Sequence, residues 1–371
     1  MAKLGEFCVQ ITDGSHNPPS GVEQSEYLML SSKNIDDDII TTDSPRFLSD
    51  SDYIVENKRT NVNEGDLLMT IVGTIGRVAI VPQELEGICL QRSVAVIKPN
   101  RKAINNRYLM YQLQNMRPFL EKEARGVAQK GIYLKQVGQL NIRVPELAQQ
   151  EQIVKVLDKV SVLISLRKQQ LTKLDELVKA RFVEMFGTFP TNPFRWSTGK
   201  IQDVVSDVRY GSSRPAVEGG KYPYLRMNNI TYSGELDLHD TKRIDIPDSE
   251  LDKCTVRRGD VLFNRTNSKE LVGKTCVYNR DELMVLAGFV IRVRVNERIR
   301  PEVLSAFLNM DFSKRMLIGM CKTAIGQANI NAKELQNIDL YIPPIELQDQ
   351  FVTLKNKVDQ QKQTVQQSLE K

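Results

Sequence analysis

A long, uninterrupted helix is predicted in the middle of the chain by its apolar positions. Residues 149–187 contain no proline, and no glycine before Gly187, and apolar side chains recur there every seven residues. This stripe consists of Leu157, Ile164, Leu171, Val178 and Met185. A second row, Ile153, Val160 and Leu174, lies three or four residues away, and Arg167 and Arg181 interrupt its later part. The pattern is typical of a coiled-coil seam on a helix about 55 Å long, at 1.5 Å per residue.

A second, shorter helix is predicted at residues 346–371, where Phe351, Val358 and Val365 recur every seven residues. A helix with so long an apolar stripe is not expected to be stable alone in water. The simplest physical account is that the two seams bury each other, with the helices antiparallel. The alternative is that each helix lies on its own neighbouring globular segment.

The remaining segments, 1–148 and 188–345, are predicted to be globular. In the first, residues 71–82 and 92–99 are strand-like, residues 106–124 have helical spacing, and residues 139–145 resemble a last strand. The expected fold class is α/β, more closely α+β: two similar mixed domains separated by two long antiparallel helices, with approximate two-fold symmetry.

The two globular segments and their helices form a duplication. Gly65-Asp66 corresponds to Gly259-Asp260, and the segments that begin at Lys3 and Lys200 open the two copies. Near the end of each copy, a proline is followed by a Gln-acid-Gln signature around Glu151 or Asp349 and then by a helix. Three matched segments in the same order, at nearly one offset, indicate a domain duplication, because solenoid repeats are much shorter.

Composition narrows the possible chemistry. The chain has 371 residues, a formal net charge of +5, five cysteines with no CxxC pair, and two histidines. We therefore expect no metal site, no disulfide framework and no cofactor. The sequence shows neither a Walker A motif nor an apolar segment long enough for a membrane span, which favours a cytoplasmic protein.

Two segments have a weak similarity to catalytic motifs. NPPS at Asn17–Ser20 has serine where an amino-methyltransferase loop has an aromatic residue, and residues 247–253 do not fit the spacing of a nuclease motif. We therefore expect neither methyltransferase nor nuclease activity from this chain alone.

The duplicated elements together resemble the specificity subunit of type I restriction–modification enzymes. The resemblance spans nearly the whole chain and rests on the duplicated Gln-acid-Gln helix starts, the duplicated Gly-Asp segments and the Asp13–Pro19 run. It implies target-recognition domains at 1–148 and 188–345 and conserved helices at 149–187 and 346–371. It also implies that each domain reads one part of a bipartite DNA site. The implied partners are double-stranded DNA, two methyltransferase subunits and a restriction/translocase subunit.

Polar, glycine-containing loops are the best candidates for contacts with base edges, because Arg, Lys, Asn and Gln supply the hydrogen bonds and glycine permits close approach. The candidates in the first domain are Ser15, His16, Arg77, Arg125, Gln129, Lys130 and Tyr133. Those in the second domain are Arg214, Arg226, Asn228, Asn264, Arg265, Asn267, Lys269, Gln327 and Asn329. Because the two sets differ, we expect an asymmetric target. A helix-joining loop or a solvated turn without a ligand remains the alternative for each group.

The helices are also expected to bind protein partners. Besides the seam residues, Val156, Leu163 and Leu177 form another row that ends near Phe182 and Phe186. This row either faces a partner subunit or is buried against the chain's own domains. Two other functions remain open: a helical adaptor that does not bind DNA, and the recognition part of a fused type II restriction–methylation enzyme.

Overall fold

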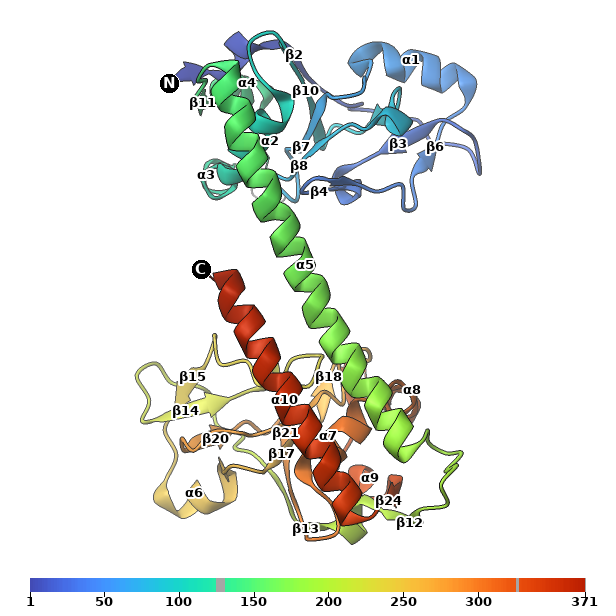
Figure 1. Ribbon diagram of the computed structural model, residues 1–371, viewed down its shortest axis with the longest axis vertical. Coiled ribbons are helices and arrows are strands. Elements are labelled where there is room, and N and C mark those ends of the chain that lie inside the picture. The colour runs from blue at the N-terminus through green and yellow to red at the C-terminus, as the bar shows by residue number, and fades with distance from the viewer. Residues whose placement is uncertain (125–130, 325–326, 371) are drawn as a thin grey trace. The chain divides into compact units, whose positions relative to one another are not determined.

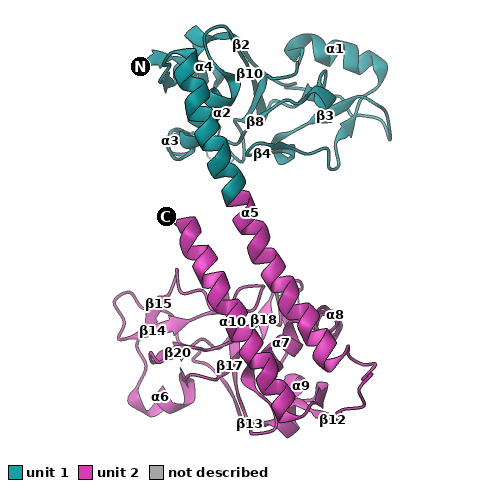
Figure 2. Cartoon of the chain, viewed as in Figure 1, with its two compact units in different colours: residues 1–163 teal, residues 164–371 magenta. Residues whose placement is uncertain are grey.

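The computed structural model describes residues 1–124, 131–324 and 327–370 (Figure 1). The chain divides into two compact units, residues 1–163 and 164–371, whose boundary falls inside the long helix α5 (Leu147–Phe186) (Figure 2). Both mix strands and helices, as the sequence predicts.

Unit 1 is built on a four-stranded antiparallel sheet. Its strand order is β2 (Cys8–Asp13), β10 (Val94–Pro99), β7 (Leu67–Thr70) and β8 (Val78–Ile80). The other strands are β6 (Arg46–Phe47), β3 (Leu28–Leu30) and β9 (Cys89–Leu90) in one sheet, with the pairs β1 (Ala2–Lys3) and β11 (Asn141–Ile142), and β4 (Ile35–Asp36) and β5 (Ile39–Ile40). The helices are α1 (Asp50–Thr60), α2 (Asn106–Asn115), α3 (Arg117–Glu123), α4 (Leu134–Gly138) and the first part of α5, with short 3₁₀ turns η1 (Leu4–Phe7), η2 (Ser32–Asn34) and η3 (Gln83–Leu85).

Unit 2 repeats this order of elements. Its four-stranded sheet is β13 (Val205–Tyr210), β21 (Val290–Val295), β17 (Val261–Asn264) and β19 (Thr275–Val277). A second sheet contains β15 (Lys242–Ile244), β14 (Tyr222–Leu225), β20 (Met284–Leu286) and β16 (Thr255–Val256), and β12 (Ser197–Lys200) pairs with β24 (Asp339–Ile342). A small third sheet contains β18 (Thr266–Asn267), β23 (Gln327–Asn329) and β22 (Lys322–Ala324). The helices are α6 (Asp248–Cys254), α7 (Pro301–Asn309), α8 (Asp311–Met320), α9 (Ala332–Gln336) and α10 (Ile345–Glu370), with the 3₁₀ turns η4 (Ile201–Val204) and η5 (Met227–Asn229).

The four-stranded sheet in each unit is buried on both faces, because successive side chains of a strand point to opposite sides. In β7, Leu67 and Met69 pack in one cluster with residues of α2, while Leu68 packs in another cluster with residues of β3 and β9. In β17, Phe263 packs with residues of α7, and Leu262 packs with residues of β14 and β20. Each unit therefore stacks helices, the central sheet and a smaller sheet.

The duplicated Gly-Asp pairs begin the central strands β7 and β17. Gly65 and Gly259 have φ angles of +77° and +89°, which glycine adopts without steric cost. Asp66 accepts hydrogen bonds from the Asn63 amide at 2.9 Å and from Lys98. Asp260 accepts the corresponding bonds from the Arg257 amide at 2.9 Å and from Arg294 Nε at 2.8 Å. The signature therefore closes a turn and ties it to the neighbouring strand.

The duplicated Gln-acid-Gln signature fixes the start of each long helix. Gln150 is fully buried; it accepts a hydrogen bond from the Asn105 amide at 2.8 Å and donates to the carbonyls of Ala103 and Pro145. Gln348 is also fully buried and makes the same three bonds. Its partners are the Arg300 amide at 2.8 Å and the carbonyls of Arg298 and Pro343.

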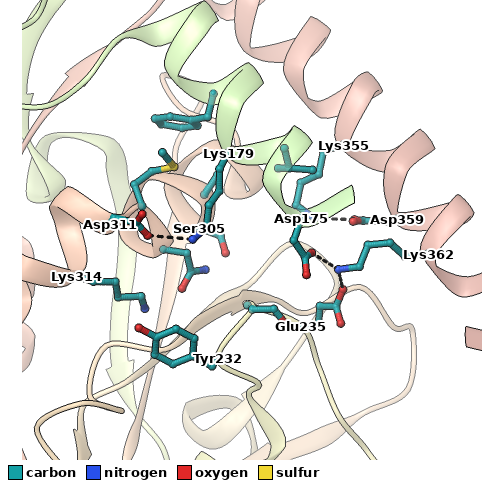
Figure 3. A pocket seen from close by; sticks show the side chains of 17 residues that line it. Asp175, Lys179, Tyr232, Glu235, Ser305, Asp311, Lys314, Lys355, Asp359 and Lys362 are labelled. Atoms are coloured by element: carbon teal, nitrogen blue, oxygen red, sulfur yellow. Dashed lines mark hydrogen bonds and ion pairs between the residues drawn. The ribbon is translucent and has the colours of Figure 1, made fainter. Parts of the chain in front are cut away.

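The end of α5 packs antiparallel against α10 within unit 2. Phe351 is fully buried, and its ring centroid lies 5.6 Å from that of Phe182 and 5.4 Å from that of Phe186. Further along α10, Lys362 forms ion pairs with Asp175 of α5 and with Glu235 (Figure 3). Along α5, Asp175 comes before Phe182, whereas along α10 its partner Lys362 comes after Phe351, which packs on Phe182. The two helices therefore run antiparallel.

The burial of the seam residues matches the predicted α10 stripe, since Val358 and Val365 are each only 5% exposed. On α5, Val178 packs beside the core cluster and Leu171 is half-buried, whereas Ile164 is 41% exposed. Phe182 and Phe186 are 2% and 1% exposed, so they form the contact with α10 and do not belong to an outward row. The three rings of Phe182, Phe186 and Phe351 pack edge to face, which buries them together.

Across the described part of the chain, none of the helices is long and apolar enough to cross a membrane.

Candidate nucleic-acid interface

One end of the four-stranded sheet brings the predicted loops of each unit together. Because neighbouring strands are antiparallel, the ends of β2 and β7 lie at the same edge as the starts of β10 and β8. In unit 2, the ends of β13 and β17 likewise lie with the starts of β21 and β19. We call this edge, with the loops attached to it, the loop end of the unit. The candidate residues that closely follow or precede these strands are Ser15, His16, Arg77, Arg214, Arg265, Asn267 and Lys269.

Arg265 is the centre of the loop end of unit 2. Its guanidinium carbon lies 4.9 Å from the ring centroid of Tyr210, at the end of β13. Its Nη2 donates to Asn329 Oδ1 at 3.1 Å, and its backbone carbonyl accepts from the Ile330 amide at 2.9 Å. Arg265 is partly exposed as a residue, its Nε is buried without a hydrogen-bond partner among the described residues, and the cation–π contact and the hydrogen bond hold its guanidinium in place.

The small sheet β18–β23–β22 joins two loops that were predicted separately as DNA-contacting loops. Thr266 lies opposite Asn329, and Asn267 lies opposite Ala328. The Asn267 side chain is half-exposed, and Lys269 is exposed beyond it. Gln327 has a backbone position in this sheet opposite Ala324. Two segments that are distant in the sequence are therefore joined in one small sheet.

The side chains of three other candidate residues in unit 2 are bonded to other groups of the protein. Asn264 is fully buried, and its Oδ1 accepts from the Thr266 amide at 3.3 Å, so its side chain does not reach the surface. Arg214 makes two hydrogen bonds to Glu250, and these lower the pKa of that carboxyl. Arg226 pairs with Asp240 at 2.8 Å. Asn228, by contrast, is exposed.

The loop end of unit 1 uses a different set of contacts. His16 Nε2 lies 2.8 Å from Asp13 Oδ2, and Arg59 of α1 donates to the other oxygen of this carboxylate at 2.7 Å. Ser15 is 6% exposed and donates to Glu56 of α1 at 3.0 Å. His16 is thus held at the surface, whereas the Ser15 hydroxyl is turned inward.

The remaining candidates of unit 1 are more scattered. Arg77 Nε lies 3.7 Å from Asp36 Oδ1, and Tyr133 is 71% exposed at the start of α4. Val72 and Gly131 form a backbone bridge at the place where Thr266 and Asn329 pair in unit 2. Arg125, Gln129 and Lys130 lie outside the described residues.

Sequence reasoning missed a matched turn at the loop end of each unit. The turn runs from Gln91 to Val94 in unit 1 and from Ala287 to Val290 in unit 2, with N···O distances of 3.0 and 2.9 Å across it. The prediction of a strand over residues 92–99 begins two residues too early, because β10 begins at Val94. Gly288 was the available signal, because glycine often marks a turn next to a strand.

The chemistry offered at the loop ends is that of hydrogen bonding and aromatic contact. Within the residues that the structure describes, no group of three or more His, Cys, Asp or Glu side chains is arranged to hold a metal ion. Guanidinium, amide and ammonium groups on loops are the side chains that contact base edges and phosphates.

Comparison with known families identifies the class of protein to which this fold belongs. The sequence model of the type I restriction modification DNA specificity domain matches residues 31–176 and 193–371. The chain belongs to this family and contains the domain twice.

Individual relatives are distant. The specificity subunit of the type I restriction enzyme EcoKI from Escherichia coli K12 is 24% identical over 229 residues, which cover 57% of this chain and 49% of that subunit. The MjaVIII specificity subunit of Methanocaldococcus jannaschii is 24% identical over 330 residues, 82% of this chain and 75% of that protein. The crystal structure of a type I S subunit from M. genitalium aligns with a TM-score of 0.53 at 12% identity, covering 100% of this chain and 91% of the other. The chain thus spans about half the length of the first of these relatives and shares the fold of the solved subunit.

Proposed function

We propose that this chain is the sequence-recognition subunit of a type I restriction–modification system. The loop end of each unit contacts one half of a divided DNA site, and the two halves have different base sequences. Each domain, 1–148 and 188–345, is one reader, and the helices 149–187 and 346–371 connect the readers and hold partner subunits.

The observation that carries this proposal is the contrast between scaffold and loop end. The buried Gln150 and Gln348 make the same three hydrogen bonds in the two units. At the loop ends, Arg265 over Tyr210 has a different chemistry from His16 beside Asp13. A duplicated scaffold with different polar surfaces fits two readers for two unlike half-sites, because direct readout depends on the side chains presented.

Catalysis is assigned to partner subunits. By analogy with the family, these are two methyltransferase subunits and a restriction/translocase subunit, in the cytoplasm, and the chain itself is non-catalytic. Exposed apolar residues of α5 support a protein interface, since Val156 is 61%, Leu163 58% and Leu177 43% exposed. Leu157, by contrast, is half-buried.

The test maps modified bases in DNA from cells that carry the chain with its methyltransferase subunit. Arg265→Ala should relax or abolish recognition in one half of the site, with an affinity loss of about 10- to 100-fold, because one good base contact contributes about 1–3 kcal/mol. Arg258→Ala is the matched control: Arg258 is 58% exposed, and it lies beside the Gly-Asp turn at the opposite end of β17.

Competition binding with the mapped duplex measures the same effect in the purified complex. A site that stays unchanged in both halves with Arg265→Ala would remove Arg265 from the interface. Binding that shows no preference for the mapped site over other DNA would refute the proposed function as a whole.

A further inference from the structure

The missed turn is anchored by the same backbone hydrogen bonds in both units. In unit 1, the Arg92 amide donates to the Ser15 carbonyl, and the Ser93 carbonyl accepts from the Ile71 amide, each at 2.9 Å. In unit 2, the Gly288 amide donates to the Ser212 carbonyl at 2.7 Å, and the Phe289 carbonyl accepts from the Arg265 amide at 3.0 Å. The turn therefore joins the end of β2 or β13 to the end of β7 or β17, at the centre of the loop end.

The side chains at the tip of the turn differ between the units. In unit 1, the Ser93 hydroxyl accepts a hydrogen bond from the Ser32 amide at 3.1 Å, so this position is closed by the protein itself. In unit 2, the matched residue is Phe289, whose side chain is 51% exposed. The backbone of Phe289 is bonded to Arg265, the residue that the proposed function places against DNA.

The phenyl ring of Phe289 is exposed in a polar, cationic surface, and its position is fixed by the turn. The first four residues of β21, from Val290 onward, are buried. Phe289 directly precedes them and is the first residue outside this buried segment. A side chain at Gly288 would bring its Cβ within 3.2 Å of the Ser212 carbonyl oxygen, so the turn is closely packed on its inner side. Phe289 thus occupies an outward position that the turn geometry fixes, and the ring lies where an apolar group of a ligand would meet it.

DNA offers such a group in the major groove. The 5-methyl group of thymine is the apolar feature of the base edges there, and Phe is among the side chains that contact it. A contact of this kind complements the hydrogen bonds of a neighbouring arginine, because each identifies a different base pair.

We propose that Phe289 is a specificity-determining residue that contacts a thymine 5-methyl group in the half-site read by unit 2. Unit 1 has no such contact at the matched position, because Ser93 is already bonded to Ser32. This inference rests on the proposed function and adds one defined base-pair feature to it.

The experiment uses the complex of the full chain with its methyltransferase subunit and the mapped duplex. Each thymine of the site is replaced in turn by deoxyuridine, which removes only the methyl group. The wild-type complex should lose about three- to fivefold in affinity at one thymine of the unit 2 half, the value expected for burial of one methyl group. For Phe289→Ser, which introduces the residue found in unit 1, thymine and uridine duplexes should bind equally at that position.

Phe289→Leu is the conservative variant and should retain the thymine preference. An unchanged urea midpoint for Phe289→Ser shows that the fold is intact, as expected for a half-exposed turn residue. If the wild-type complex is insensitive to uridine throughout the unit 2 half, or if Phe289→Ser keeps the sensitivity, the inference is wrong while sequence-specific binding still supports the proposed function. A unit 2 half-site that contains no thymine would also overturn it.

Discussion

The two units use the same framework but attach their long helices differently. At matched positions, Phe351 of α10 is fully buried among aromatic rings, whereas Ile153 of α5 is 39% exposed. The start of α5 packs the smaller Val154 into the core of unit 1 and adds polar contacts: Asp158 accepts from Arg107 Nε at 2.5 Å and from the Tyr111 hydroxyl at 2.7 Å. The two helices therefore share the sequence signature but differ in how much packing stabilises them, because the signature fixes only the start of each helix.

The largest expected difference between the units concerns these apolar positions. Phe351→Ala should lower the free energy of unfolding by about 3–5 kcal/mol, the usual range for truncation of a buried phenylalanine. Ile153→Ala should cost less than about 1 kcal/mol, because the side chain is partly in solvent. Urea unfolding of both variants measures the contrast, and equal losses would contradict it.

The buried glutamines should behave alike in the two units. Gln150→Ala and Gln348→Ala each leave an amide and two carbonyls without their partner, so each should cost about 2–3 kcal/mol. The exposed neighbours Gln152→Ala and Gln350→Ala are the controls and should change stability little. If unfolding curves show that only one of the two substitutions lowers the free energy of unfolding, the two helix starts are not equivalent.

A third difference lies in helices α3 and α8, where the carbonyl of Gly76 accepts from Arg117 in unit 1, whereas the carbonyl of the matched Gly273 accepts from the buried Lys314 in unit 2. Lys314 is 9% exposed and donates to the Gly273 carbonyl at 2.6 Å. Burial, with the nearby charges of Lys179 and Lys274, lowers the pKa of Lys314 from 10.5 to about 7. Lys314 also lies against the ring of Tyr232, as Figure 3 shows.

The lowered pKa of Lys314 makes stability depend on pH. Between pH 7 and 10.5 the unfolded chain binds more protons than the folded chain, so the free energy of unfolding rises with pH through this window. Lys314→Leu, which removes the ammonium group, should remove this slope. It should stabilise the protein by about 2 kcal/mol at pH 6 and by much less near pH 10. Thermal unfolding across this range, with the exposed Lys168→Leu as control, tests the sign; a uniform loss of stability would show that the charged form is favoured.

The smallest expected effect concerns phosphate contacts at the loop end of unit 2. The loop from Asn264 to Gly273 is longer than the matched loop from Thr70 to Gly76, and it carries the exposed Lys269. Lys269→Ala should weaken DNA binding for all sequences and reduce the slope of log K against log salt by about 1. Lys102→Ala, exposed at the opposite end of the unit 1 sheet, should leave the slope unchanged. An unchanged slope for Lys269→Ala would remove this residue from the phosphate contacts.

The sequence by itself determined the duplication, the mixed fold class, the two long helices and the family. These follow from local signals: seven-residue periodicity, glycine at positive-φ turns and glutamine at a helix start, each of which has a fixed structural requirement. The repeated signatures proved to be scaffold contacts, as Asp66 and Gln150 show.

The tertiary structure decided which polar side chains are available at the loop ends. Asn264 is directed into the protein, Arg214 and Arg226 are paired with carboxylates, and Phe182 belongs to the helix contact in unit 2. It also brought Arg265 to Tyr210 and placed Phe289 at the tip of a turn. No local pattern contains this information, because exposure and pairing depend on segments that are far apart in the chain and meet only when the sheet forms.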